Sequence, residues 1–395
     1  MGRTKGDEKR DPQWSAGGEP ASALPPGLTR ALSWLRGRFA DPIDLQLLAA
    51  VAGVRPRTLE TQFRTYLGAT PLGWVRRMRL VHARRALQRP GEDTTVTGVA
   101  LTSGFAQLGR FAATYRAAYG EPPSATLRRH RSAAMLHEDS PDADAVRLTW
   151  EALSDAFAVA PRECARALEC LEGAQSAAPE YGLPVALAAW CWGQRAAHGF
   201  SAAPSLDRQR SVDAVKRACA LARNDALALT LASGALTLAH RLEEADRLLE
   251  RALGLDPWLP YGWIRRGWAS VYMGDPQGGL RELALAMHLN PLGPMRNIAF
   301  IGIGSAHFAL GRYAQAARWV RSGTAGFPGA VWADRLAVAA AYHAGAGDEA
   351  RRMARRLLRK DGDLTVERAR TAWPFRAPFM ARLGDGLQAA GVPLH

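Results

Sequence analysis

The clearest pattern of apolar and polar positions lies in residues 44–63, DLQLLAAVAGVRPRTLETQF, and predicts two short helices joined by a tight turn. Apolar residues at positions 45, 48, 49 and 52 share one helical face, and Asp44 is placed to cap that helix. Gly53 can take the positive φ of a turn, and Leu59 and Phe63 are spaced to anchor a second helix on the first. The segment therefore predicts a helix-turn-helix motif.

The same pattern recurs in residues 96–115, VTGVALTSGFAQLGRFAATY. Gly104 stands at the turn, and Phe111 and Tyr115 are spaced to anchor the second helix. Between the two copies, residues 71–87 carry apolar residues on one helical face and arginines on the other. The N-terminal quarter of the chain is thus predicted to hold two helix-turn-helix motifs on either side of one amphipathic helix.

From about residue 145 onward the pattern is that of a repeated pair of helices. Pro257 and Pro291 are 34 residues apart, and aligning the chain on them places small residues over one another, which lets paired helices approach closely. We expect four clear repeats across 226–365 and two degenerate ones across 146–225. The predicted fold class is all-α, with an N-terminal double helix-turn-helix domain followed by an α-solenoid.

Charge is concentrated in one part of the chain. The 395 residues include 51 basic and 37 acidic side chains, which gives a formal net charge of +14. Residues 28–132 hold 17 arginines and six acidic residues, a net charge of +11, whereas residues 1–27 are neutral and residues 133–395 carry +3. Arginine stays charged at physiological pH, and its guanidinium can donate two parallel hydrogen bonds to phosphate or guanine. This concentration predicts that residues 28–132 bind nucleic acid.

Composition divides the chain into four segments. Residues 1–27 are polar and rich in Gly and Pro, which predicts a disordered N-terminal arm. Residues 133–144 contain several aspartates and a proline and are predicted to be an acidic linker. Two folded domains remain, at 28–132 and 145–395.

Residues 28–131 resemble the DNA-binding domain of the AraC/XylS family, in which two helix-turn-helix units flank one linking helix. The resemblance rests on the order and spacing of four blocks: LLAAVAGVRPRTLETQF, GATPLGWVRRMRLVHARRAL, VALTSGFAQLGRFAATY and YGEPPSATLRRHR. Three positions depart from the family's usual residues, because Arg55 stands where Ser is usual, and Thr61 and Ala113 stand where Arg is usual. The domain also lies near the N-terminus here, whereas in the family it is usually at the C-terminus.

The start of the second helix in each unit holds the candidate base-reading residues, because that end enters the major groove. Arg can fork onto guanine, Gln onto adenine, and Glu can accept from cytosine. The candidates are Arg57, Thr58, Glu60, Thr61 and Arg64 in the first unit, and Gln107, Leu108, Arg110 and Thr114 in the second. The arginines expected at phosphates or on the plain surface are Arg76, Arg77, Arg84 and Arg128.

The helix pairs of the second domain resemble tetratricopeptide (TPR) repeats, with Trp263 and Gly267 at the positions of the aromatic residue and glycine of the first helix. The resemblance implies a groove lined by the first helices and a C-terminal tail that caps the array. The candidate partner-binding residues are Tyr261, Ile264, Trp268 and Phe308. Because these are apolar, we expect an apolar partner, either a helix of another protein or a segment of this chain such as residues 1–27 with Trp14. The alternative is that they simply pack inside the array.

Sequence signatures of other protein classes are absent. There is no Gly-Lys phosphate loop, no His pair at i and i+4, no metal-ligand spacing of Cys and His, and no Gly-x-Ser-x-Gly motif. We therefore predict that the protein is not an enzyme and has no catalytic residues, metal or cofactor. No apolar run reaches the ~18 residues of a membrane span, and residues 1–27 lack the apolar core of a signal peptide. These features predict a cytoplasmic protein with no membrane partner.

Two functions fit these observations. The first is a sequence-specific, DNA-binding transcriptional regulator whose repeat domain senses a signal or binds a protein partner. The alternative is a TPR-type scaffold with only non-specific DNA attachment, which the missing arginines at Thr61 and Ala113 favour. Selection of DNA sites from a random pool separates the two. The sequence leaves open the target genes, the sign of regulation, the effector and homo-oligomerisation.

Overall fold

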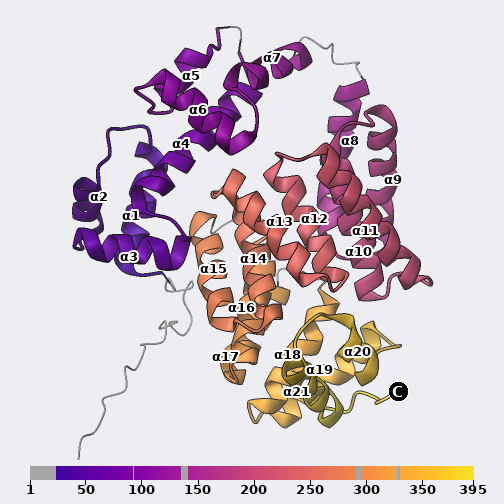
Figure 1. The fold of residues 1–395 in the computed structure, drawn as a ribbon. Helices are drawn as coiled ribbons and strands as arrows, with labels where there is room; N and C mark the ends of the chain where they lie inside the picture. The colour runs from indigo at the N-terminus through magenta and orange to yellow at the C-terminus, as the bar shows by residue number, and fades with distance from the viewer. Residues whose placement is uncertain (1–23, 92, 135–140, 291–294, 326, 328–329) are drawn as a thin grey trace, which may run out of the picture.

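The computed structural model describes residues 24–395 except 92, 135–140, 291–294, 326 and 328–329. In this described part every regular element is a helix, which confirms the predicted all-α class. The helices form an N-terminal part, α1 to α7, and a larger repeat part, α8 to α21 (Figure 1).

In the N-terminal part, the long helix α4 runs between two clusters of shorter helices (Figure 1). Helices α2 and α3 form the first helix-turn-helix motif, and α5 and α6 form the second. The bounds are α1 Pro26–Arg38, α2 Leu45–Ala52, α3 Pro56–Leu67, α4 Pro71–Gln88, α5 Val96–Thr102, α6 Leu108–Tyr119 and α7 Pro123–Ala134.

Local chemistry explains where these short helices begin and turn. The Asp44 carboxylate accepts a hydrogen bond from the backbone N–H of Leu47 at 2.8 Å and so caps α2. Gly53 and Gly104 both have positive φ, +63° and +83°. A Cβ on Gly104 would also lie 2.6 Å from the carbonyl oxygen of Ala40, so only glycine fits this turn.

Large apolar side chains hold each unit against α4. In the first unit, Phe63 is fully buried in the same cluster as Trp74 of α4. In the second, Phe111, Tyr115 and Tyr119 form a row of edge-on rings, with centroids 5.7 and 4.7 Å apart. These aromatic rings fix both motifs to one rigid helix.

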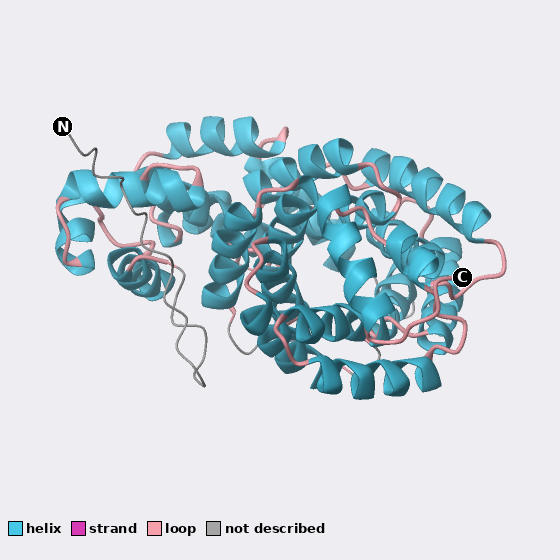
Figure 2. Ribbon diagram, turned by 90° about the horizontal axis from the view of Figure 1, so that it is seen from below, coloured by secondary structure: helices cyan, strands magenta, loops and turns pink. Residues whose placement is uncertain are grey.

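The repeat part contains six successive helix pairs, from α8/α9 to α18/α19, which stack into a strongly curved array (Figure 2). The last four pairs, α12 to α19, lie where the 34-residue period predicts repeats. The bounds are α8 Pro141–Phe157, α9 Pro161–Ala177, α10 Gly182–His198, α11 Pro204–Leu221, α12 Ala226–Leu238, α13 Leu242–Leu255, α14 Pro260–Met273, α15 Pro276–Leu289, α16 Arg296–Ala309, α17 Tyr313–Ala325, α18 Val331–His343 and α19 Gly347–Lys360.

Glycines let the two helices of a pair approach closely. A Cβ on Gly267 would lie 2.5 Å from Cγ of Leu283 and 3.1 Å from the carbonyl oxygen of Gly279, both in the partner helix. A Cβ on Gly304 of α16 would likewise lie 2.5 Å from Cγ2 of Val320 in α17. The small residues that define the repeat in the sequence are therefore contact points between backbones.

The C-terminal tail folds back along the array instead of covering only its end. Its helices are α20, Val366–Ala372, and α21, Ala377–Ala389. Helix α21 packs on α18, while the Phe375 ring lies 4.5 Å from that of Tyr272 in α14, and Phe379 lies 4.9 Å from Phe308 in α16. The tail thus contacts the first helix of three successive pairs.

The N-terminal and repeat parts share a packed interface around α4. The indole of Trp74 lies 5.8 Å from that of Trp258 and 6.5 Å from that of Trp263, which belongs to α14. Further along α4, Arg85 forms a 2.7 Å ion pair with Asp256. An aromatic cluster and an ion pair therefore join the linking helix directly to the repeats.

Parts of two predicted segments lie outside the described residues. These are residues 1–23 of the predicted arm, with Trp14, and residues 135–140 of the predicted linker. Residues 24–27 are described and differ from the prediction, because Leu24 is buried and α1 begins at Pro26. Ordered helix also enters the predicted linker from both sides, since α7 ends at Ala134 and α8 begins at Pro141.

Candidate DNA-binding interface

Helix α3 presents one face to the core and the opposite face to solvent. Leu59 and Phe63 are fully buried, and Pro56 starts the helix at a position that needs no N–H partner. The predicted base-reading residues Arg57, Thr58, Thr61 and Arg64 are exposed, and Glu60 is half-buried. The structure therefore brings all five to the solvent side of one helix.

Helix α6 is mounted in the same way. It begins at Leu108, so Gln107 occupies the N-cap position just ahead of the helix and is exposed. Arg110 is exposed on the first turn, and Thr114 is half-buried one turn later. With Phe111 turned into the core, the exposed start of α6 is free to meet another surface.

Thr61 and Thr114 occupy matching positions, four residues after Arg57 and Arg110. The Thr61 hydroxyl donates to the backbone carbonyl of Arg57 at 2.9 Å, and the Thr114 hydroxyl donates to that of Arg110 at 2.6 Å. Each hydroxyl hydrogen is therefore used within its own helix, which leaves only the two oxygen lone pairs and a methyl group for an external partner. Among the candidate base-reading residues, hydrogen-bond donation therefore falls to the arginines, Gln107 and the exposed Thr58.

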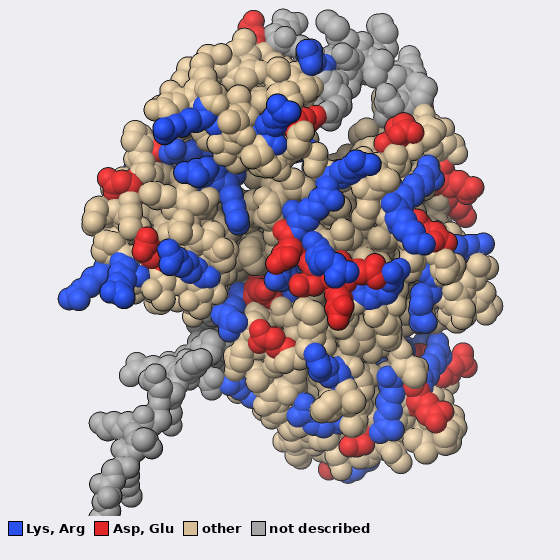
Figure 3. Space-filling model, viewed as in Figure 1, with Lys and Arg blue, Asp and Glu red and all other residues tan. Residues whose placement is uncertain are grey.

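The charge on this part of the surface is mostly positive. In Figure 3 the N-terminal part shows several basic side chains and few acidic ones, whereas the repeat part shows both signs intermingled. Among the described salt bridges, none involves a side chain of α3 or α6. The guanidinium groups of Arg57, Arg64 and Arg110 are thus available to an anionic partner.

The arginines of the linking helix do not all face outward. Arg76 and Arg77 on α4 and Arg128 on α7 are exposed. The guanidinium carbon of Arg84, however, lies 4.2 Å from the ring centroid of Tyr119, with Nη1 buried. Arg84 is therefore not a plain surface residue, because a cation–π contact holds it against Tyr119, and its role as a phosphate contact stays a prediction.

Tyr119 connects the second recognition helix to the repeat part. Its hydroxyl donates a long, 3.5 Å hydrogen bond to the carbonyl of Leu255 in α13, and Asn224 donates to its backbone carbonyl at 2.6 Å. Burial raises the pKa of Tyr119 well above its usual value, against the opposing charge of Arg84. The residue therefore stays neutral, and the C-terminal end of α6 is tied to the repeats.

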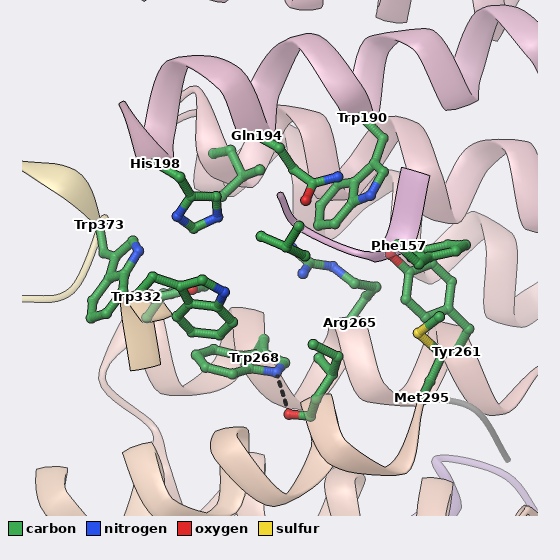
Figure 4. A pocket seen from close by; sticks show the side chains of 14 residues that line it. Phe157, Trp190, Gln194, His198, Tyr261, Arg265, Trp268, Met295, Trp332 and Trp373 are labelled. Atoms are coloured by element: carbon green, nitrogen blue, oxygen red, sulfur yellow. Dashed lines mark hydrogen bonds between the residues drawn. The ribbon is translucent and has the colours of Figure 1, made fainter. Parts of the chain in front are cut away.

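The predicted partner-binding residues are all buried. Tyr261 and Trp268 lie on the wall of a cavity in the repeat part (Figure 4), whereas Ile264 and Phe308 do not. Phe308 is fully buried and packs on Phe379 of the tail. The tail therefore covers two of these residues, because the Phe375 ring lies 6.4 Å from that of Trp268 and the Phe379 ring lies against Phe308. The ring of Tyr261 instead packs on Phe157 of α8, with centroids 5.2 Å apart.

Sequence reasoning missed the polar residues of that cavity. Arg265 lies on its wall between Tyr261 and Trp268, and Gln194 and His198 face it from α10. A signal was present in the sequence. Arg265 comes four residues after Tyr261 and three before Trp268, so all three lie on one helical face. An arginine within an apolar stripe indicates a buried charge.

Comparison with known proteins finds relatives of the helix-turn-helix part. A family model described as a helix-turn-helix domain matches residues 48–129. The XylDLEGF operon transcriptional activator 2 of Pseudomonas putida is 37% identical over 107 residues, which are 27% of this chain and 68% of that protein. The XylDLEGF operon transcriptional activator 3 of the same species is 36% identical over 116 residues. Those residues are 29% of this chain and 35% of the relative, so this chain spans only about a third of its length.

Two solved structures are similar to parts of the chain. A probable AraC family transcriptional regulator from Rhodopseudomonas palustris is 35% identical and covers 26% of this chain and 96% of that one, with a TM-score of 0.25. A tetratricopeptide repeat protein from Parabacteroides merdae is 13% identical and covers 62% of this chain and 99% of that one, with a TM-score of 0.35.

Two further findings concern the described part of the chain. No helix there combines the length and the apolar character needed to cross a membrane. No group of three or more His, Cys, Asp or Glu side chains there is placed to hold a metal ion.

Proposed function

This chain belongs to the AraC/XylS family of helix-turn-helix transcriptional regulators, and from this premise we propose that it binds a specific DNA sequence through α3 and α6. Residues 28–132 form the DNA-binding unit of this proposal, and residues 145–395 form the unit that receives a regulatory signal. The main observation behind this proposal is that α3 and α6, the second helix of each motif, are both fixed on α4 with their first turns exposed.

Rigid mounting on one helix sets the expected binding geometry. Two recognition helices on one face would enter successive major-groove segments about 34 Å apart. Arg57 and Arg110 suit guanine, and Gln107 suits adenine. The exposed Arg76 and Arg77 suit phosphates on the intervening backbone. A single chain would then protect an asymmetric site of about two helical turns.

Site selection from random DNA with the full chain tests this proposal. We expect one enriched motif of about two turns. Arg57→Ala should relax base preference in one half of the site by about 1–3 kcal/mol, and Arg110→Ala should do so in the other half. The matched control is Arg76→Ala, an exposed arginine of α4, which should weaken all sequences alike.

Two outcomes contradict the proposal. If Arg57→Ala and Arg76→Ala give the same profile on a panel of mismatched sites, α3 does not read bases. If no motif is enriched while DNA is still bound, the scaffold with non-specific DNA attachment replaces the regulator. The intrahelical hydroxyl of Thr61 and the small Ala113 favour this second function, because both lack the usual guanidinium.

A further inference from the structure

The repeat part encloses a small cavity between α10, α14 and α18 (Figure 4). Its walls are largely aromatic, with Trp190, Trp268, Trp332 and Trp373 among the lining residues. Its volume is about 40 Å³, taken as the space that the centre of a water molecule can reach. At about 10–15 Å³ for each water, this space admits roughly three atoms of that size.

Buried polar atoms without hydrogen-bond partners gather around this cavity. Within the described part of the chain, six such atoms belong to its lining: Nε and Nη2 of Arg265, Oη of Tyr261, Nε1 of Trp332, Nδ1 of His198 and Oε1 of Gln194. Buried polar groups in proteins nearly always have partners, so a cluster of this kind marks a place that receives polar atoms of a ligand. Most of the six atoms can donate.

Arg265 carries the positive charge of the site. The residue is 5% exposed, and its guanidinium carbon lies 5.0 Å from the ring centroid of Trp190. None of the described salt bridges includes Arg265, whereas the equally buried Arg335 pairs with Asp361 at 2.9 Å. A buried cation without a counter-ion is costly, so Arg265 favours an anion in the cavity.

The other titratable groups of the lining are neutral at physiological pH. Burial, reinforced by Arg335, lowers the pKa of His198 to about 3. Burial raises the pKa of Tyr261 to about 12, although the neighbouring Arg265 opposes this. The lining therefore carries one positive charge, which a ligand with one negative charge would neutralise.

We propose that this cavity binds the carboxylate of a small monocarboxylate with an apolar body. A carboxylate has three heavy atoms, which matches the size of the cavity, and it can accept two parallel hydrogen bonds from one guanidinium. A phosphate monoester carries about two negative charges at pH 7, so a single arginine would leave one of them unpaired in a dry site.

The apolar body of the ligand has a place beside the cavity. A groove of about 600 Å³, measured in the same way, shares the lining residues Phe157, Tyr261, Met295 and Ile298 with the cavity. The groove continues to Trp150, whose side chain is exposed. A molecule with its carboxylate at Arg265 could extend past Tyr261 into this apolar space.

Backbone strain at one lining residue adds support. Val159, which lines the cavity, has a φ of +50°, a conformation that a β-branched residue rarely adopts. Such strain persists where the surrounding structure fixes the residue, and it clusters at ligand sites.

This inference deepens the proposed function, because it names the signal that the repeat part receives. Binding of a carboxylate needs no DNA, however, so the site and the regulator can fail separately.

Calorimetric titration of the full chain tests the site. The probes are 4-phenylbutyrate, indole-3-propionate and octanoate, with 4-phenylbutanamide and inorganic phosphate as comparisons. We expect saturable binding of at least one carboxylate with a change in tryptophan fluorescence, while the amide binds at least about tenfold more weakly, because hydrogen bonds to charged groups are the stronger ones. Failure of all three carboxylates, or equal binding of 4-phenylbutyrate and its amide, overturns the proposal.

Variants locate the binding at the cavity. Arg265→Gln should weaken the carboxylate about tenfold or more, and Tyr261→Phe should weaken it less. The matched control is Arg266→Gln, since the neighbouring Arg266 pairs with Asp246 and Glu282 instead of lining the cavity. Unchanged binding by Arg265→Gln contradicts the assignment.

A measurement without ligand guards against misfolding. Because Arg265 is an uncompensated charge, the Tm of Arg265→Gln should equal or exceed that of the parent protein. Arg335→Gln should lower the Tm, because Asp361 then loses its closer partner at 2.9 Å and keeps only Arg368 at 3.6 Å. A lower Tm for Arg265→Gln would show a structural role for Arg265 and overturn the proposal.

Discussion

At the scale of single residues, Glu282 of α15 is a half-buried carboxyl with an unusual titration. The Ser270 hydroxyl donates to its Oε2 at 2.5 Å, and Nε of Arg266 lies 3.5 Å from its Oε1. Burial nevertheless raises the pKa of Glu282 from 4.5 to about 7, because desolvation outweighs both contacts. Between these pH values the folded state holds a proton that the unfolded state has released. The free energy of unfolding should therefore fall as the pH rises through this window.

Glu282→Gln replaces this titrating carboxyl by a neutral amide, so the free energy of unfolding should depend less on pH between 4.5 and 7. At pH 8 the variant should be more stable than the parent by about 1–3 kcal/mol, since the desolvated charge is gone. Denaturant unfolding at pH 5 and pH 8 measures the difference. Glu349→Gln is the control, because Glu349 is an exposed carboxyl paired with Arg321. The same loss of stability between pH 5 and pH 8 in the parent and in Glu282→Gln would rule out this account.

The residues that the sequence predicts well are those whose role is local. Asp44 as a cap and Gly104 as a turn follow from their immediate neighbours, and both are observed. The environments of Arg84 and Arg265 depend on Tyr119 and Trp190, which reach them only through tertiary packing. The base-reading candidates stay predictions, because exposure shows where a side chain is available but not what it binds.

At the scale of helices, the close approach of α14 and α15 depends on Gly267. A methyl group there would meet the side chain of Leu283 and the backbone of Gly279, which has little room to move. Gly267→Ala should therefore lower the free energy of unfolding by about 1–3 kcal/mol, although alanine is the better helix former. Thermal or denaturant unfolding of the full chain measures this loss.

Gly254 provides the matched control in the neighbouring helix. It is exposed near the end of α13, and a Cβ there meets nothing within 4 Å. Gly254→Ala should raise the free energy of unfolding by up to about 1 kcal/mol, because it reduces the freedom of the unfolded chain at no steric cost. Equal effects of Gly267→Ala and Gly254→Ala would show that a methyl group at position 267 does not push α14 and α15 apart.

Helix positions in the chain were largely predictable from local signals. The linking helix was expected at 71–87 and spans Pro71–Gln88, and α13 ends at Leu255, two residues before the proline that marks its repeat. The position of the tail was not predictable, because Phe375 and Phe379 find their partners about 70 to 100 residues earlier in the chain. Spacing within a helix indicates which face is apolar but not which segment covers it.

At the scale of the whole molecule, helix α14 has two occupied faces. Trp263 turns toward Trp74 on the linking helix, while Tyr261 and Arg265 line the cavity. The helix next to it, α13, ends just before Asp256, which pairs with Arg85 of α4. The sequence did not reveal this interface, because Trp74 reads equally well as a core residue of its own domain. A movement of α14 on ligand binding would therefore reach α4 through direct contacts.

This arrangement predicts that the carboxylate and DNA influence each other's binding. Saturating carboxylate should change the affinity of the full chain for its selected DNA site by about 5–150-fold, and DNA should change the carboxylate affinity by the same factor. Asp256→Asn removes the ion pair with Arg85 but retains a side-chain oxygen for the backbone N–H of Trp258. The variant should bind carboxylate normally without DNA and show weaker coupling. Arg321→Gln, which breaks an exposed ion pair far along the array, should leave the coupling intact. Equal DNA affinity with and without carboxylate in the parent protein would mean that the shared helix α14 does not transmit the signal.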